Sequence, residues 1–216
     1  VGLASSYLAY LGYAEKHKLS LGALCVSFQL ISPTLCRIIR FGSDHPLDRE
    51  YFSSIFDILT IFLSTVNADS LPTRVALMSL IKPYIGSWLT LYSDSKHIGQ
   101  MIIILSKLTT LPKTGYPNPP LCEEAWCFFH PVLDLVRNEC KGQQLAVDDH
   151  SHALKFFSNL CCDAEHGVEV FECVNEFLDE WLSSLTGCGP QCLEHWGSLI
   201  ASFSTIPALI PKISPK

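Results

Sequence analysis

Apolar residues recur at helical spacing along nearly the whole of this 216-residue chain. A clear example is the set Leu21, Leu24, Phe28 and Ile31, whose members stand three or four residues apart and so fall on one side of a helix. Pro33 comes two residues later and ends the pattern, because proline disrupts a helix interior. No segment shows the strict alternation that is typical of a half-buried strand. We therefore predict an all-α fold of about ten helices.

Breaks between the apolar segments divide the rest of the chain into further predicted helices. Asp48 and Pro72 stand at helix starts, where a capping carboxylate and a first-turn proline are favoured. Residues 165–167 are predicted to form a turn. The predicted helices cover residues 48–66, 72–91 with a kink or break at Pro83, 97–108 after a cap at 93–95, 123–140 with a kink at Pro131, a helix capped by Asp148 or Asp149, 168–185 as one helix or two, and a last helix opened by Pro190 and ended by Pro207 and Pro211.

A proline-rich linker runs from Pro112 to Pro120. Such a segment cannot continue a helix and favours an extended connection. We expect residues 1–216 to form a single helical-repeat domain, with a subdivision into 1–111 and 121–216 at this linker as the alternative. The chain begins with Val1 rather than Met, so we also expect it to be a piece of a larger protein.

The composition narrows the classes of partner. Hydrophobic residues make up 48% of the chain and charged residues only 17%, which is too apolar for disorder and poor in the charges that coat an isolated domain. We infer that another protein covers part of the surface. The net charge is -6 and the 15 Lys and Arg are scattered, whereas nucleic-acid binding needs clustered cations. No direct nucleic-acid partner is expected.

Two features bear on the compartment. The longest apolar runs, 55–66 and 98–105, are short or interrupted by polar residues, while a membrane span needs about 20 apolar residues, so no membrane association is expected. Most of the ten cysteines, such as Cys25 and Cys161, stand within apolar helical segments. They are better explained as buried free thiols than as disulfides or zinc ligands. We expect an intracellular location, nuclear or cytoplasmic.

Residues 153–160, Ala-Leu-Lys-Phe-Phe-Ser-Asn-Leu, carry the most specific pattern in the chain. They resemble the third helix of an armadillo repeat, which commonly reads Ala-Leu-Trp-Ala-Leu-Ser-Asn-Leu-Ala. A weaker match at 22–30 places Gln29 at the position of the repeat's Asn, and 74–77 is fainter still. The resemblance implies a right-handed α-solenoid of irregular armadillo or HEAT-like repeats, with another helical bundle as the alternative.

The same resemblance implies a partner-binding groove. It places Asn159 on the binding face, where the family's Asn contacts the main chain of a bound peptide. Lys155 lies one turn away on the same face and replaces the family's groove Trp, so recognition of basic peptides does not follow. We expect Lys155, Asn159 and Gln29 to contact a partner segment. The alternatives are that Asn159 caps a neighbouring turn and that Lys155 is an ordinary solvated side chain.

No set of residues in the sequence predicts a metal or catalytic site. Two Cys/His sets could supply zinc ligands, but neither has the tight two-residue Cys spacing of common zinc modules, and we expect neither to bind metal: Cys122, Cys127 and His130, and Cys188, Cys192 and His195. His150 and His152 point about 200° apart on a helix, so we expect them in a loop or cap. Cys161 and Cys162 beside His166 form a weak nucleophile and base pair.

We therefore expect no enzyme activity and no cofactor. The expected function is an interaction scaffold that binds a peptide or helical segment of another protein. The alternative is a structural or oligomerisation domain of a complex, in which apolar helices pack against another copy or subunit. A run of carboxylates from Glu169 to Glu180 is expected to form a solvated helix face, or else to dock a basic partner segment.

Overall fold

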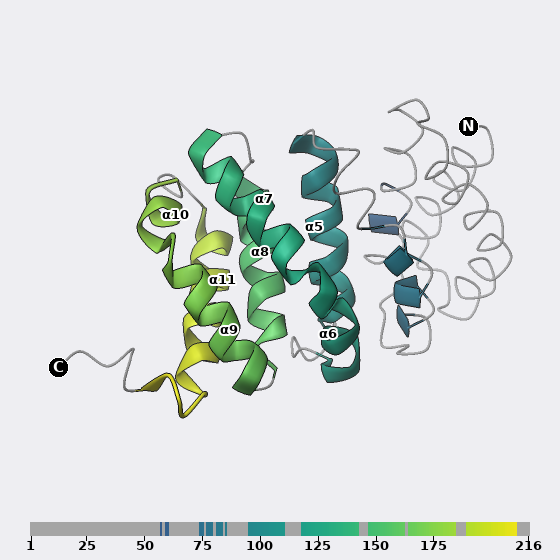
Figure 1. The fold of residues 1–216 in the computed structure, drawn as a ribbon. Helices are drawn as coiled ribbons and strands as arrows, with labels where there is room; N and C mark the ends of the chain where they lie inside the picture. Colours follow the sequence, from purple (N-terminus) through teal and green to yellow (C-terminus); the bar gives the residue numbers. More distant parts are fainter. Residues whose placement is uncertain are drawn as a thin grey trace, which may run out of the picture. The chain divides into compact units, whose positions relative to one another are not determined.

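The computed structural model describes residues 95–110, 118–142, 147–162, 164–184 and 189–210, together with isolated positions between 57 and 85. The predicted helices before residue 57, and Gln29 with them, lie outside the described residues. Within the ranges from 95 onwards the elements are all helical (Figure 1). They are α5 (Ser95–Thr109), α6 (Pro119–Ala125), the 3-10 helix η1 (Trp126–Phe128), α7 (Phe129–Gly142), α8 (Val147–Leu160), α9 (Ala164–Asn175), α10 (Leu178–Ser184) and α11 (Pro190–Ser204).

The prediction of an all-α fold is confirmed for this part of the chain. Helix α5 matches its predicted range to within two residues, α7 ends at Gly142, and α11 begins at Pro190 as predicted. The predicted helix 123–140 is three elements instead of one. It breaks at η1 rather than at Pro131, which lies in the first turn of α7, where its missing N–H costs nothing.

Two local predictions between α8 and α10 are wrong. Helix α8 begins at Val147, so Asp148 and Asp149 lie inside its first turn rather than before it. Residues 165–167 belong to α9, and the chain turns later, where the Phe177 N–H donates to the Val174 carbonyl. Gly167 lies within α9, and Ile206 packs against it so closely that no room is left for a side chain.

The chain divides into two compact units, residues 1–104 and 105–216. The division falls within α5 rather than at the proline-rich linker. The end of that linker is part of α6, because Pro119 and Pro120 form its first turn and the Asn118 side chain accepts a hydrogen bond from the Leu121 N–H at 3.3 Å. The following paragraphs concern the second unit.

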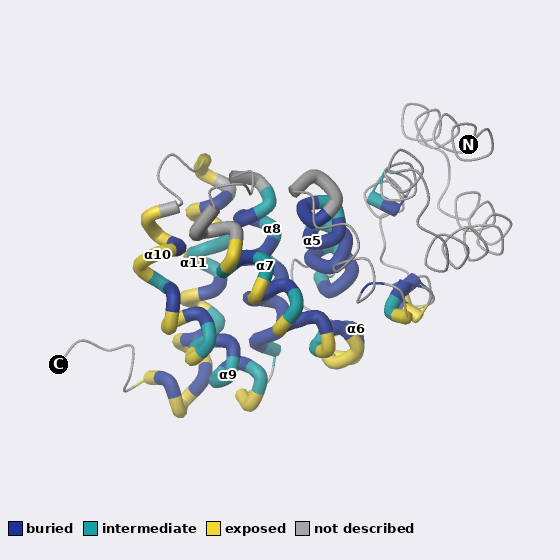
Figure 2. Tube along the Cα trace, turned by 45° about the horizontal axis from the view of Figure 1, so that its top comes forward, coloured by how far each residue is buried: buried dark blue, intermediate teal, exposed yellow. Residues whose placement is uncertain are grey.

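Helix α8 is the centre of the second unit. It packs against α6, α7, α9 and, most extensively, α11. Figure 2 shows buried residues along its length, and Leu154, Phe156 and Phe157 are all fully buried. Neighbouring helices cover most of α8. Among its described side chains, only Asp149, His152 and Lys155 are partly exposed.

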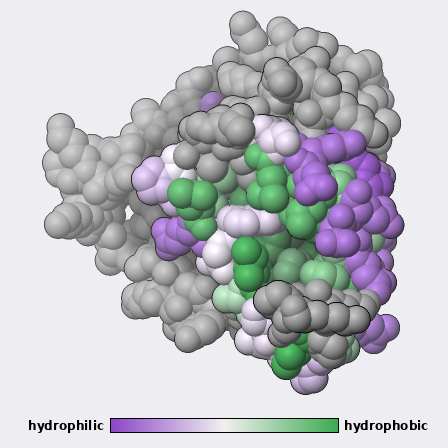
Figure 3. Space-filling model, turned by 90° about the vertical axis from the view of Figure 1, so that its left-hand side faces the viewer, coloured by the Kyte–Doolittle hydropathy of each residue, from purple (hydrophilic) through white to green (hydrophobic). Residues whose placement is uncertain are grey.

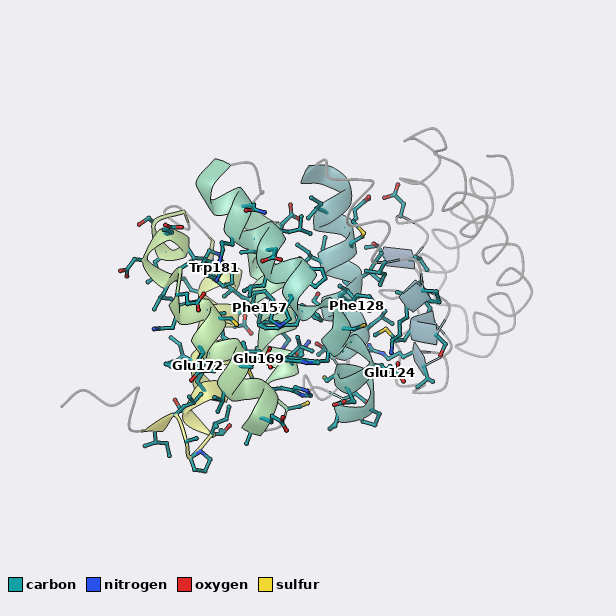
Figure 4. The ribbon with its side chains drawn as sticks, in the orientation of Figure 1. Glu124, Phe128, Phe157, Glu169, Glu172 and Trp181 are labelled. Atoms are coloured by element: carbon teal, nitrogen blue, oxygen red, sulfur yellow. The ribbon has the colours of Figure 1, made fainter. Side chains whose placement is uncertain are left out.

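An aromatic cluster joins four helices around Trp181. The Trp181 ring meets Phe157 of α8 edge-on with 5.9 Å between centroids, stacks on Phe177 at 5.3 Å and meets Trp196 of α11 edge-on at 5.8 Å. Phe157, which Figure 4 labels together with Trp181, in turn meets Phe129 of α7 with 5.6 Å between centroids. Each such pair stabilises the fold by about 0.5–1.5 kcal/mol beyond the contribution of the apolar area that it buries. The cluster therefore fixes α7, α8, α10 and α11 relative to one another.

Candidate partner-binding face

Helices α8 and α11 run parallel and in register. The Ser151 hydroxyl lies 2.7 Å from Nδ1 of His195, and the Ser158 hydroxyl lies 3.1 Å from that of Ser202. Both contacts join residues that are 44 apart in the sequence, and they lie seven residues, or about two turns, apart along each helix. The two helices therefore lie side by side and keep the same register over about two turns.

His195 lies at the N-terminal end of the contact between α8 and α11, where it bonds to Ser151. Its Nδ1 lies 2.9 Å from the Ser151 carbonyl as well as near the Ser151 hydroxyl, so it has a partner in either protonation state. Burial lowers the pKa of His195 most, the bond to the Ser151 carbonyl and the charge of Glu194 raise it, and the charge of Lys155 lowers it. The lowered pKa favours the neutral ring.

His152 extends the polar contact to α5. Its Nδ1 lies 3.2 Å from the Ser106 hydroxyl, and its ring centroid lies 6.4 Å from that of His195. Both rings are half-buried. We call this row of side chains the α8 seam: Ser106 of α5, Ser151, His152, Lys155 and Ser158 of α8, and His195 and Ser202 of α11.

Lys155 is half-buried within the seam. Burial lowers the pKa of Lys155 most, while the negative charge of Glu194 on α11 raises it. The charge of Lys155 also lowers the pKa of His195, so the ammonium group lies close to the contact between α8 and α11. The ammonium is a hydrogen-bond donor beside two imidazole rings, and a segment lying along the seam would meet all three.

The structure buries Asn159, whereas the armadillo resemblance implies an open position on a groove. Its side chain is 1% exposed, and Nδ2 donates to the Ser106 carbonyl at 3.2 Å, to the Thr109 hydroxyl at 2.8 Å and to the Thr110 hydroxyl. The amide group therefore holds α8 against the end of α5. Of the three predicted partner-binding residues, the structure brings only Lys155 to the seam surface, and Gln29 lies outside the described residues.

His150 lies in the core instead of a loop or cap. It belongs to α8, is 4% exposed, and its Nδ1 accepts a hydrogen bond from Nε1 of Trp181 at 3.1 Å. An indole nitrogen can only donate, so Nδ1 of His150 must be unprotonated in this contact. Burial lowers the pKa of His150 and favours the same neutral ring. No pattern in the sequence predicts the contact between His150 and Trp181, which are 31 residues apart.

The cysteine and histidine sets do not converge. The Cys122 thiol is buried and donates to the Thr109 carbonyl at 3.8 Å, while His130 pairs with Glu169 at 2.9 Å. Cys188 lies outside the described residues. Among the residues that the structure describes, no group of His, Cys, Asp and Glu could hold a metal ion.

The third Cys/His combination is also separated. The thiol of Cys161 donates to the Phe157 carbonyl at 3.3 Å, within its own helix. The His166 ring stacks on Trp126 with 4.0 Å between centroids, and its Nδ1 lies 3.9 Å from a Glu123 oxygen. Thiol and imidazole are therefore engaged with different partners.

The acidic run is divided between α9 and α10 rather than lying on one helix. Glu169 pairs with His130, and Glu176 pairs with Arg137 of α7 at 2.8 Å. The Arg137 guanidinium also lies 5.2 Å from the centre of the Phe177 ring. Glu172, which Figure 4 labels on α9, is exposed, as are Asp179 and Glu180 on α10.

Comparison of the chain with protein-family models, with curated proteins and with solved structures found no match. The likeness to armadillo and HEAT repeats therefore depends on residues 153–160 and stays a prediction. Among the described residues, no helix is both long enough and apolar enough to cross a lipid bilayer.

Proposed function

We propose that this chain is a non-enzymatic helical-repeat module that binds a segment of another protein. The in-register contact of α8 with α11 is the observation that carries the proposal. In an α-solenoid, equivalent helices of successive repeats stack side by side. Helices α8 and α11 are separated by the two helices α9 and α10, and their contacts join residues 44 apart, close to the roughly 40-residue period of armadillo and HEAT repeats.

The α8 seam is the proposed binding surface. Its partly exposed members include His152, Lys155 and His195, whose imidazole and ammonium groups could bond to the main chain of an extended or helical segment. The serines Ser106, Ser151 and Ser158 are buried and join the helices to one another.

In this proposal Lys155 contacts the partner, Gln29 keeps its predicted role further along the array, and Asn159 acts by holding α8 against α5. The binding chemistry requires no cofactor. The six described free cysteines support the prediction of a reducing, nuclear or cytoplasmic location.

A charge reversal at Lys155 tests the proposal. Lys155→Glu would place a carboxylate on the seam beside Glu194, so we expect it to abolish capture of the proteins that the original chain retains from a cell lysate. The matched control is Lys107→Glu, because Lys107 is also half-buried and burial also lowers its pKa. Both variants must first match the original chain in circular dichroism. Equal capture by both variants would contradict the proposed seam.

A structural or oligomerisation role is the second candidate. It is favoured by Leu193 and Ile200 of α11, which are 63% and 43% exposed. Exposed apolar side chains in one area mark contact surfaces. The mass of the chain in solution, measured by sedimentation, distinguishes this role, because an oligomerisation domain would form a stable homo-oligomer in the absence of any partner.

A further inference from the structure

One nitrogen of the His195 ring is anchored, and the other reaches solvent. Nδ1 lies 2.9 Å from the Ser151 carbonyl oxygen, which can only accept a hydrogen bond, so the proton of the neutral ring belongs on Nδ1. Nε2 makes no hydrogen bond within the part of the chain that the structure describes, and it is not buried. The neutral His195 ring therefore presents an unprotonated acceptor at the surface of the α8 seam.

The surroundings of the ring keep it in this form. The Ser151 hydroxyl lies 2.7 Å from Nδ1, so two oxygen atoms of one residue face the same nitrogen and fix the orientation of the ring. Burial lowers the pKa of His195 most, and the bond to the Ser151 carbonyl raises it. Of the two charges that act on the ring, that of Lys155 lowers the pKa and has the larger effect, while that of Glu194 raises it. The ring is therefore mostly neutral above pH 7, where Nε2 can accept.

The donor that best suits this acceptor is neutral and belongs to a peptide main chain. Because the charge of Lys155 outweighs that of Glu194 at the ring, a cationic donor is repelled there. A main-chain N–H is neutral, and a carbonyl of the same main chain can accept from the Lys155 ammonium nearby. In a helix only the first four N–H groups lack an internal partner, whereas an extended segment offers one at every residue except proline. These properties favour an extended segment over a helix.

We infer that Nε2 of His195 accepts a hydrogen bond from a main-chain N–H of an extended partner segment. The inference rests on the proposed binding function of the α8 seam, and it adds the acceptor atom and the conformation of the partner. Hydrophobic side chains, such as those gathered at the centre of the face in Figure 3, offer no acceptor of this kind. A main-chain N–H is therefore recognised at the polar seam and not on such an apolar area.

Nitrogen NMR of the isotope-labelled full chain tests the acceptor without any partner. At pH 7.5 we expect the His195 ring to show a protonated Nδ1 and an unprotonated Nε2. The signals are assigned by their loss in His195→Asn, whose amide can keep the bond to the Ser151 carbonyl but has no atom at the position of Nε2. A proton on Nε2 with none on Nδ1 would overturn the inference, because the seam would then present a donor there.

The binding probe is a peptide of about 12 residues, which at about 3.3 Å per extended residue is longer than two turns of the seam. It is selected from a random library for binding to the original chain and for loss of binding to Lys155→Glu. Methylation of each main-chain nitrogen in turn then removes one N–H at a time. We expect one methylated position to weaken binding to the original chain at least tenfold, and to have little effect on binding to His195→Asn, which lacks the acceptor.

The affinity for the unmodified peptide should also depend on pH. A protonated Nε2 cannot accept, so we expect the original chain to bind more weakly at pH 5.5 than at pH 7.5. His195→Gln carries an amide oxygen that accepts without titrating, so it should keep most of the affinity and lose less of it in acid. His152, Lys155 and Glu194 are the described titratable groups that face the ring, and His152→Gln is the control that should keep the pH dependence.

The outcomes separate this inference from the function on which it rests. If Lys155→Glu rejects the peptide but no methylated position weakens binding to the original chain, the inference is wrong and the seam remains a binding site. If no peptide distinguishes the original chain from Lys155→Glu, the proposed function is wrong and the inference fails with it. The methylation series and the pH comparison stay informative if His195→Asn does not fold.

Discussion

The Asn159 side chain joins two helices through one amide group. Its Nδ2 donates to acceptors at Ser106, Thr109 and Thr110, and almost none of the side chain meets solvent. Replacement by Ala removes these bonds and opens a cavity in the contact between the two helices, while the Ser106 carbonyl still accepts from the Thr109 and Thr110 hydroxyls.

We therefore expect Asn159→Ala to lower the free energy of unfolding by about 2–4 kcal/mol, measured by urea denaturation. The control is Asn175→Ala, because Asn175 is exposed on α9 and its loss should cost less than about 0.5 kcal/mol. Equal effects of the two substitutions would show that the amide of Asn159 does not hold α8 and α5 together.

His150 makes stability depend on pH. Burial lowers its pKa below the ordinary value of 6.5, so the unfolded chain binds a proton that the folded chain does not as the pH falls below about 6.5. The stability that comes from the neutral ring is complete above that pH and is lost as the pH falls towards the lowered folded-state pKa. Protonation would also remove the acceptor that Trp181 uses.

The pH dependence can be measured as the urea midpoint at pH 7.5 and at pH 5.5. We expect the original chain to lose stability over this interval and His150→Gln to lose less, since Gln can accept from Trp181 without titrating. His130→Gln, a change at an exposed histidine, should keep the full acid-induced loss. The same loss in the His150 variant as in the original chain would contradict this role.

The sequence predicted the helix that contains residues 153–160, but not where its side chains point. The segment 153–160 predicted a specific role for Asn159 and Lys155, and both lie at contacts between helices. The direction in which Asn159 points depends on acceptors about 50 residues earlier in the chain. Local periodicity carries no information on such a contact, and the same is true of the bond from Trp181 to His150.

Two glycines on neighbouring helices provide opposite predictions. A side chain at Gly167 would collide with the end of Ile206, so Gly167→Ala should force Ile206 to move and lower stability by about 1–2 kcal/mol. Gly197 has open space around it within an exposed helix face, so Gly197→Ala should raise stability by about 0.5–1 kcal/mol. Thermal unfolding measures both. Similar shifts at the two sites would contradict the packing of α9 against residues after α11.

Element boundaries were predictable where Pro or Gly marks them. Pro190 starts α11 and Gly142 ends α7, because one fits a first helical turn and the other is a poor helix residue. The break at η1 and the turn at Glu176 and Phe177 contain neither residue. Aromatic contacts accompany both: Trp126 stacks on Phe129 at 4.8 Å and Phe177 stacks on Trp181 at 5.3 Å, and helix propensity does not report such tertiary contacts.

At the level of the whole molecule, periodicity alone predicts the all-α class, and the part of the chain that the structure describes confirms it. The helical-repeat arrangement stays a proposal, supported by the in-register pair α8 and α11.

Isothermal titration of a protein captured through the seam, against the original chain and against Lys155→Glu, tests the proposed function most directly. We predict that the substitution weakens binding at least tenfold, or about 1.4 kcal/mol, while Lys107→Glu changes the affinity little. An affinity that is the same for Lys155→Glu and for the original chain would contradict a binding function at the α8 seam.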